Sequence, residues 1–120
     1  MIGAIVGDIV GSRFEFDNIK SKDFAFFHPA CRPTDDSVMT LAVGEALLEH
    51  RERGGDLADA AIRQMKAWGL RYPDAGYGGM FVDWLEEENP KPYRSWGNGA
   101  AMRVTHDHPE GLAGAERVRF

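Results

Sequence analysis

Hydrophobic residues recur at the spacing of an α-helix along three stretches of the chain. Residues 35–53 and 56–70 each carry them on one broad face, and residues 81–88 form a shorter amphipathic stretch. No segment alternates convincingly between apolar and polar residues with the period of two that marks a half-buried strand. The sequence therefore predicts an all-α fold, in the form of a compact helical bundle.

Local sequence signals predict where these helices begin and end. Thr34 is a favoured N-cap residue for the first helix, and Gly54-Gly55 ends it after about Arg53. Asp56 can cap the second helix, which Tyr72-Pro73 stops. The residues expected to face the core are, in chain order, Val38, Met39, Leu41, Ala42, Val43, Ala46, Leu47, Leu48, Leu57, Ala60, Ala61, Met65, Trp68, Val82, Trp84 and Leu85.

The first twelve residues, MIGAIVGDIVGS, fit either a helix or a buried strand. The i, i+4 spacing of Gly3, Gly7 and Gly11 favours the helix. Because such a glycine stripe lets another backbone come close, we expect this helix to be buried. Asp8 interrupts the apolar run, which is too short to span a bilayer, so we expect no membrane segment.

The remaining segments read mainly as loops. Residues 16–33 predict a loop, and residues 74–80 a second one that is rich in glycine. Residues 93–104 predict a polar glycine loop that runs into a helix of small residues. Residues 105–111 read as another loop, and residues 112–118 as a last short helix. The expected aromatic anchors of the first loop are Phe24, Phe26 and Phe27.

Composition narrows the class of protein. The 120 residues suit one domain, residues 1–120, and a hydrophobic content of 43% with three tryptophans indicates a globular fold. The net charge of −5, without a block of lysine or arginine, argues against an electrostatic nucleic-acid footprint. Cys31 is the single cysteine, so an internal disulfide is excluded. With no secretory leader, this favours a cytoplasmic location.

The stretch of Thr34, Asp35 and Asp36 leaves two interpretations open. In the first, Thr34 caps a helix, and the two carboxylates complement the positive end of its dipole. In the second, one hydroxyl and two carboxylates are oxygen ligands of the kind that Mg²⁺ or Mn²⁺ prefers. Water, substrate or a second acidic motif would then complete the octahedral shell.

Asp8 and Glu15 form a second acidic pair. They lie seven residues apart, close to two helical turns, so a continued helix would place both on one face. One interpretation is that one carboxylate caps or pairs while the other is solvated. The alternative is that a carboxylate reaches the metal region as an acid, a base or a group that orients water.

Two loops near the end of the chain carry further candidates. Gly97 and Gly99 of SWGNGAAMR allow a phosphate or ribose to approach the backbone closely, although a plain Asn-Gly turn has the same pattern. His106 and His108 could bind zinc, but the single cysteine and the lack of a second ligand pair argue against that. Hydrogen bonding to a polar ligand or surface exposure suits them better. No histidine arrangement specifically implicates Cys31 as a nucleophile.

Four stretches in this order resemble the ADP-ribosylglycohydrolase family, which includes the dinitrogenase-reductase-activating glycohydrolases. They are GAIVGDIVGSRFEF, CRPTDDSVMTLAVGEALL, YRSWGNGAAMRV and THDHPEGLAGAE, and the match runs from residue 1 to about residue 116. The resemblance implies an all-α fold with a pair of divalent metal ions, Mg²⁺ or Mn²⁺, in a central cleft. It also implies hydrolysis of the bond that joins ADP-ribose to a protein side chain or to another acceptor.

The resemblance assigns roles to residues at matching positions. Thr34, Asp35 and Asp36 match the first metal motif of the family, and Glu15 matches a carboxylate near the metals that is implicated in catalysis. The implied substrate-binding residues, from two glycine loops and one later histidine, are Gly78, Gly79, Ser95, Gly97, Asn98, Gly99 and His106.

The sequence also departs from the family pattern. Members run to roughly twice this length, and a unit of that size would bury its surface better. Their second metal motif, Asp-x-Asp followed by Thr or Ser, occurs nowhere in the 120 residues, and a helical segment expected between Val104 and Thr105 is missing. The chain thus reads as a shortened member with an incomplete metal site.

Two functions that involve ADP-ribose follow from this reading, beside a third in which the chain is a structural or interaction protein and all these motifs are vestigial. The first is an active hydrolase, in which a metal-activated water attacks the anomeric carbon and Glu15 orients or deprotonates it. The missing ligands would then come from a second copy of the chain, in a homo-oligomer formed through faces that the shortening exposes. The second is a catalytically inactive homologue that folds, oligomerises and at most binds ADP-ribose weakly. In either case the expected partner is ADP-ribose or an ADP-ribosylated protein, with no nucleic acid and no membrane.

Overall fold

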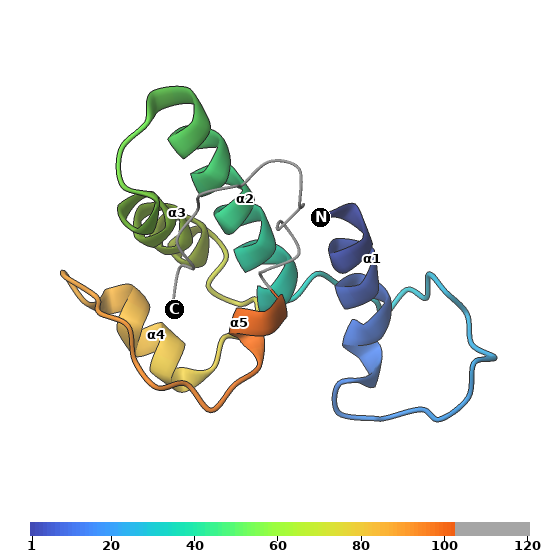
Figure 1. Ribbon diagram of the computed structural model, residues 1–120. Coiled ribbons are helices and arrows are strands. Elements are labelled where there is room, and N and C mark those ends of the chain that lie inside the picture. The colour runs from blue at the N-terminus through green and yellow to red at the C-terminus, as the bar shows by residue number, and fades with distance from the viewer. Residues whose placement is uncertain (103–120) are drawn as a thin grey trace.

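A pair of helices packed side by side forms the centre of the molecule. The computed structural model describes residues 1–102. In it, α2 (Asp35–Arg53) packs along α3 (Leu57–Arg71), as Figure 1 shows. Gly54 and Gly55 turn the chain between the two helices with φ angles of 71° and 94°, which strongly favour glycine. The predicted bounds of α2 are confirmed, and α3 ends one residue later than predicted.

The other elements surround this pair. The chain starts with α1 (Ile2–Gly11) and a single 3-10 turn, η1 (Ser12–Phe14). After α3 come α4 (Gly79–Glu86) and the short α5 (Gly99–Met102), which lies against α2. Residues 1–102 are helical without strands, so the predicted all-α fold is confirmed. The predicted loop at 105–111 and the predicted helix at 112–118 lie outside the described residues.

The main core lies where α2, α3 and α4 meet. Met39 and Met65 are the largest side chains that are almost wholly buried there. The rest of this core consists of Val38, Ala42, Phe81, Trp84 and Leu85. The predicted burial of two residues is wrong, because Leu48 is 55% exposed and Val82 is 39% exposed.

The short helix α4 begins two residues earlier than predicted. The Gly78 carbonyl accepts hydrogen bonds from the N–H groups of Phe81 and Val82, which starts the helix at Gly79. Glu87 is already extended, so the helix ends at Glu86 and not near Glu88. The predicted glycine loop is shorter by the same two residues at its end.

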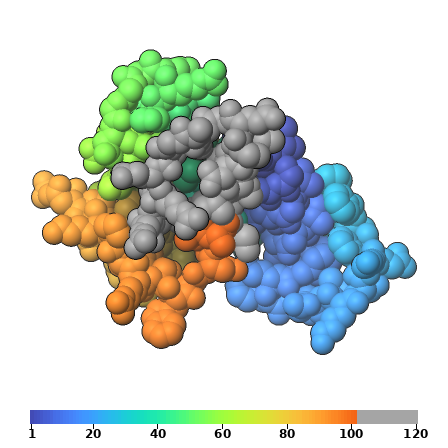
Figure 2. Space-filling view, viewed as in Figure 1, coloured from blue at the N-terminus to red at the C-terminus, as the bar shows by residue number. Residues whose placement is uncertain are grey.

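The N-terminal helix forms as predicted but is not buried as predicted. Within the described chain, Val10 is the buried residue of α1, and Ile2 is 80% exposed. A Cβ atom added at Gly3, Gly7 or Gly11 would have no neighbour within 4 Å, so no described backbone comes close to the stripe. In Figure 2 the blue N-terminal segments form a lobe at one side of the molecule.

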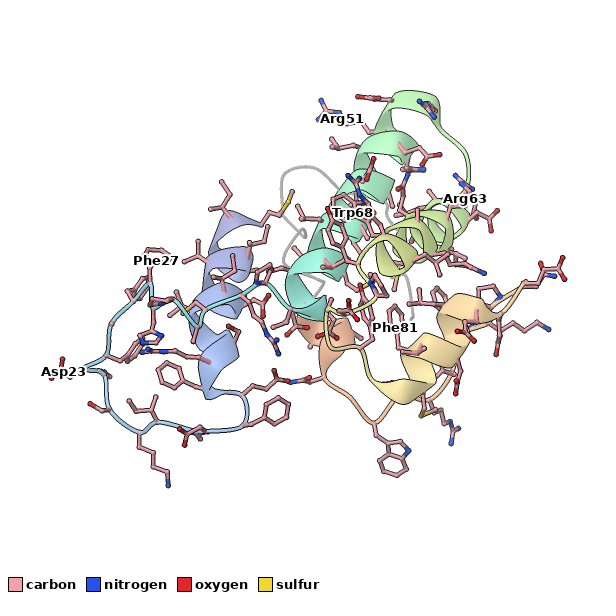
Figure 3. All side chains as sticks on the ribbon, turned by 180° about the vertical axis from the view of Figure 1, so that it is seen from behind. Asp23, Phe27, Arg51, Arg63, Trp68 and Phe81 are labelled. Atoms are coloured by element: carbon pink, nitrogen blue, oxygen red, sulfur yellow. The ribbon has the colours of Figure 1, made fainter. Side chains whose placement is uncertain are left out.

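Aromatic side chains of the long first loop contact one another. The Phe14 and Phe24 rings meet edge to face with centroids 5.2 Å apart, and the Arg13 guanidinium lies 4.3 Å from the Phe14 centroid. Phe27 is 71% exposed and lies at one edge of the molecule in Figure 3, apart from Trp68 of α3. The aromatic residues of the loop therefore pack against one another and against η1, and not in the main core.

A polar contact joins the solvent side of α2 to α3. Glu49 accepts hydrogen bonds from Gln64 at 2.9 Å and from Arg63 at 2.8 Å. These two hydrogen bonds lower the pKa of Glu49, and the one from Gln64 has the larger effect. Because the Arg63 side chain is largely exposed, the pair contributes little to stability.

None of the helices within residues 1–102 combines the length and the apolar character needed to cross a membrane.

The contact between α3 and α4 gives the first prediction. A Cβ atom at Gly69 would lie 2.6 Å from one δ-carbon of Leu85, whose side chain is buried. We expect Gly69→Ala to lower the free energy of unfolding by about 1–3 kcal/mol through overpacking. Gly7→Ala is the matched control, since its Cβ has open space and should gain up to about 1 kcal/mol of helix propensity. Urea unfolding of both variants measures the difference, and equal gains would contradict the packing at Gly69.

Candidate functional site

The first turn of α2 has a hydrogen-bond partner for each of its free backbone N–H groups. The Thr34 N–H donates to Asp8 Oδ2 at 2.9 Å, and the Asp35 N–H donates to the Ala75 carbonyl at 2.9 Å. The Asp36 N–H donates to Thr34 Oγ1 at 3.3 Å, and the Ser37 N–H donates to Asp8 Oδ2 at 3.2 Å. The start of the helix is thus capped by Thr34 as predicted, and also by Asp8 from α1.

Asp8 accepts two further hydrogen bonds from side-chain hydroxyls. Thr34 Oγ1 donates to its Oδ1 at 2.6 Å, and Ser37 Oγ donates to its Oδ2 at 2.5 Å. Its negative charge also lies at the positive end of the α2 dipole. The interpretation that one member of the Asp8 and Glu15 pair caps a helix is therefore confirmed for Asp8, although the helix it caps is α2.

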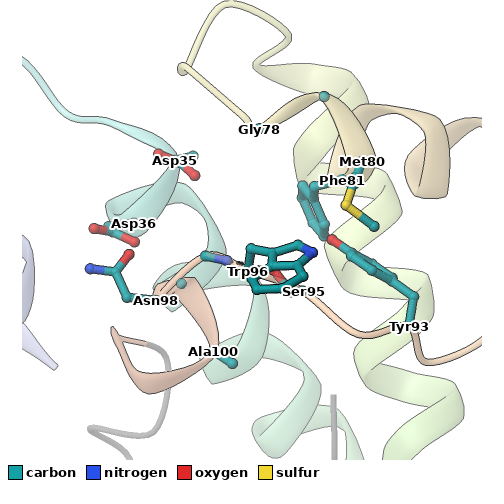
Figure 4. Close-up of a pocket in the computed structure, with 13 residues that line it drawn as sticks. Asp35, Asp36, Gly78, Met80, Phe81, Tyr93, Ser95, Trp96, Asn98 and Ala100 are labelled. Atoms are coloured by element: carbon teal, nitrogen blue, oxygen red, sulfur yellow. Dashed lines mark hydrogen bonds between the residues drawn. The ribbon is translucent and has the colours of Figure 1, made fainter.

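This capping leaves the carboxylates of Asp35 and Asp36 at the edge of a cavity of about 300 Å³. Figure 4 shows both side chains on one side of this first cavity, with Phe81, Tyr93 and Trp96 opposite. Glycine loops complete its wall. The predicted site residues that line it are Asp35, Asp36, Gly78, Gly79, Ser95, Gly97, Asn98 and Gly99. Segments far apart in the sequence therefore meet at this one place.

A second cavity of about 540 Å³ lies between α1, α2 and α5. Glu15, Thr34 and Asp36 line it, together with Asp8 and the small residues of α1. Glu15 itself is exposed, which fits a carboxylate open to water. The helix does not continue from Asp8 to Glu15, because η1 follows Gly11, yet both residues reach the same cavity.

The two cavities adjoin. Asp36 and Asn98 line both, and in Figure 4 the Asn98 side chain points toward Asp36. A single elongated molecule could therefore extend from the aromatic side of the first cavity to Glu15 in the second. The combined volume lies within the range of sites that bind small molecules and cofactors.

The oxygen atoms of this site suit a hard divalent cation in kind but fall short in number. Asp35 and Asp36 are half-buried. The Thr34 hydroxyl donates its proton to Asp8 and accepts from the Asp36 N–H, so its oxygen keeps one further lone pair. Among residues 1–102, no group of three or more His, Cys, Asp or Glu side chains is placed to hold a metal ion. The two carboxylates fit as part of a site, and further ligands would have to come from outside these residues.

The predicted site residues differ in how well the structure accounts for them. His106 lies outside the described residues. Within the glycine loop, the Ser95 hydroxyl accepts a hydrogen bond from the Gly97 N–H at 3.1 Å, which fixes the turn itself.

Trp96, which the sequence reasoning missed, lines the first cavity and is 98% exposed. Its signal was a large apolar residue inside an otherwise polar loop, between Ser95 and Gly97.

Comparison with known proteins gives a match along almost the whole chain. The model of the family described as ADP-ribosylglycohydrolase matches residues 1–119. The chain is 30% identical to ADP-ribosylhydrolase ARH3 of Xenopus tropicalis over an alignment of 129 residues. That alignment covers 87% of this chain and 36% of the relative, so the chain spans about a third of the length of that protein. No solved structure matches the chain significantly.

The double role of the Thr34 hydroxyl gives the second prediction. Thr34→Val keeps the shape of the side chain but removes the acceptor for the Asp36 N–H and the donor to Asp8. We expect the free energy of unfolding to fall by about 1–2 kcal/mol. Thr34→Ser retains the hydroxyl and should stay within about 0.5 kcal/mol of the wild type. Chemical unfolding tests both, and equal loss in the two variants would show that the methyl group matters instead.

Proposed function

The chain belongs to the ADP-ribosylglycohydrolase family, and on this premise we propose that it binds ADP-ribose and hydrolyses its bond to a protein side chain or another acceptor. The observation that carries the proposal is the convergence of four separate segments on two adjoining cavities. One segment ends at Glu15 and another begins at Thr34. The other two contain Gly78 and Asn98. Their meeting supplies an aromatic wall, glycine loops and carboxylates to one elongated ligand.

The first cavity suits the adenosine end of such a ligand. The exposed indole of Trp96, with Tyr93 and Phe81 nearby, offers flat apolar surface on which a base can stack. Gly97 and Gly99 lack side chains that would keep a diphosphate from the backbone. Asn98 lies where the two cavities adjoin and offers an amide to the ribose that follows.

The second cavity suits the bond that is cleaved. With the distal ribose beside Asp36, its anomeric carbon would face the region that Glu15 borders. We propose that Glu15 orients a water molecule and accepts its proton as the water oxygen bonds to that carbon. The bond from the carbon to the acceptor breaks with its electron pair, and the acceptor leaves after gaining a proton. The products are free ADP-ribose and the unmodified acceptor.

We propose that Thr34, Asp35 and Asp36 contribute ligands to a divalent ion, Mg²⁺ or Mn²⁺. When bound, such an ion would supply charge that lowers the pKa of water and offsets negative charge on the ligand. Two carboxylates and a hydroxyl leave positions in an octahedral shell for groups from outside residues 1–102. A second copy of the chain is one proposed source of these groups.

A second candidate function is binding of ADP-ribose without hydrolysis. The observation that favours it is the lack, within residues 1–102, of a third His, Cys, Asp or Glu placed beside Asp35 and Asp36 to hold a metal ion. In that case ADP-ribose would raise the melting temperature of the protein, as any ligand of the folded state does, with no turnover. Thermal unfolding with and without ADP-ribose, beside an assay for release of ADP-ribose from a modified protein, separates the two functions.

Replacement of the proposed base gives the third prediction. Glu15→Gln keeps the size of the side chain but cannot accept a proton, so kcat should fall by about 10²–10⁴-fold with a small change in KM. Release of ADP-ribose from ADP-ribosylated protein with Mg²⁺ present is the measurement. Asp17→Asn is the matched control, since this nearby exposed carboxylate lines neither cavity. An equal loss in both variants would exclude a specific role for Glu15.

Removal of the proposed stacking surface gives the fourth prediction. Trp96→Ala should weaken ADP-ribose binding by about 5–150-fold, which corresponds to the loss of about 1–3 kcal/mol for one stacked base. Trp96→Phe should recover part of the affinity. Titration calorimetry with ADP-ribose and with ribose 5-phosphate, which has no base, checks the assignment. Only ADP-ribose should lose affinity, and Phe27→Ala, an exposed aromatic distant from both cavities, should change neither.

A further inference from the structure

Asp8 is hydrogen-bonded to the residues that begin α2. Its two oxygens accept four hydrogen bonds, two from backbone N–H groups and two from the hydroxyls of Thr34 and Ser37. Oδ2 accepts three of them, and Oδ1 accepts the one from the Thr34 hydroxyl. Because an ionised carboxylate has about four lone-pair sites, most of its acceptor capacity is used at this junction, and Oδ1 keeps one site to spare beside the second cavity.

The donors lie on both sides of the carboxylates at the candidate site. Oδ2 of Asp8 holds the N–H groups of both Thr34 and Ser37, which flank Asp35 and Asp36 in the chain. The intervening N–H groups are held by the Ala75 carbonyl and by Thr34 Oγ1. With every N–H of this turn fixed, neither Asp35 nor Asp36 is needed as a cap, and both line a cavity.

The same contact also places α1 relative to α2. Among the residues described, Val10 is the fully buried residue of α1, and Ile5, Val6 and Ile9 are half-buried, so apolar packing constrains this helix less than it does the helices of the main core. Ser12 adds one polar contact, where its Oγ accepts from the Arg32 N–H at 3.0 Å. Asp8 therefore helps to determine where Glu15, which follows α1 and η1, lies relative to Asp36.

We propose that Asp8 is a positioning residue for the hydrolysis. It fixes the first turn of α2 so that Asp35 and Asp36 face the cavities, and it keeps Glu15 beside the same cavity as Asp36. This inference rests on the proposed function, but it predicts an effect on Asp35 and Asp36 that needs no ligand to observe. Misplacement of site groups by about 1 Å is enough to lower a rate or an affinity by about 10²-fold.

Two substitutions break the contact from opposite sides. Asp8→Asn replaces one acceptor oxygen with an amide that points a donor at other donors, and it removes the charge at the helix end. Ser37→Ala removes one donor, and Ser37 is buried and lines neither cavity. Leu85→Ala is the control, because it lowers stability through the core without touching Asp8.

The test combines titration of the folded proteins with ADP-ribose, in the presence of Mg²⁺, and the carbon-13 shifts of the Asp35 and Asp36 carboxyl groups. We expect Asp8→Asn and Ser37→Ala each to weaken ADP-ribose binding by about tenfold or more and to move both shifts. The double variant should bind no more weakly than Asp8→Asn alone, since both changes remove one contact. Leu85→Ala should lower the unfolding midpoint and leave the affinity and the shifts unchanged.

Other outcomes would overturn the proposal in distinct ways. Loss of affinity in Asp8→Asn with full affinity in Ser37→Ala would mean that Asp8 touches the ligand itself. Lower stability in both, with unchanged affinity and shifts, would limit Asp8 to a structural role. If the wild type binds no ADP-ribose, the proposed function fails. The carbon-13 shifts of the Asp35 and Asp36 carboxyl groups then test the positioning role without a ligand. Unchanged shifts in Asp8→Asn would overturn that role as well.

Discussion

The hydrogen bonds from Thr34 and Ser37 to the Asp8 carboxylate are the interaction on which the arrangement of the molecule depends. They join an N-terminal lobe, which buries little apolar surface, to a helical unit with its own core. Hydrophobic contact is not directional, whereas a carboxylate with four donors is held in both position and orientation. The polar contact therefore adds direction to the packing of α1 on α2, and the second cavity lies along this junction.

This interaction also bears on the two interpretations of the Thr34, Asp35 and Asp36 stretch: the helix cap at Thr34 is confirmed, and the role as metal ligands stays a prediction. A helix start needs acceptors for its free N–H groups, and acidic residues in the first turn often serve that need. Here Thr34 and Asp8 provide the acceptors from one side, and the Ala75 carbonyl provides one from the other. Groups other than the carboxylates of Asp35 and Asp36 thus hold the N–H groups of this turn, and both residues line the first cavity, while Asp36 also lines the second.

The sequence predicted the helices far better than it predicted their surroundings. The bounds of α2 and the start of α3 followed from Thr34, the Gly54-Gly55 pair and Asp56, because capping depends on neighbours within a few residues. The exposure of Leu48 and of the glycine stripe on α1 did not follow, since periodicity identifies an apolar face without showing what covers it. Family resemblance brought together the loops of the first cavity, but Trp96 and the four donors to Asp8 needed three-dimensional contacts.

Substitutions in the apolar core and substitutions at the contact between Asp8 and the start of α2 are expected to act differently. The core of α2, α3 and α4 borders the first cavity through Phe81, but it includes none of the groups that hold the first turn of α2 to Asp8. Asp8, Thr34 and Ser37 contribute less apolar burial but determine where Asp35, Asp36 and Glu15 lie. Most of the apolar burial and most of the groups that position Asp35 and Asp36 therefore belong to different residues, although Thr34 contributes to stability as well as to site geometry. A change at the junction can alter the site while the helices remain folded, because the core that stabilises them does not include the contact that orients them.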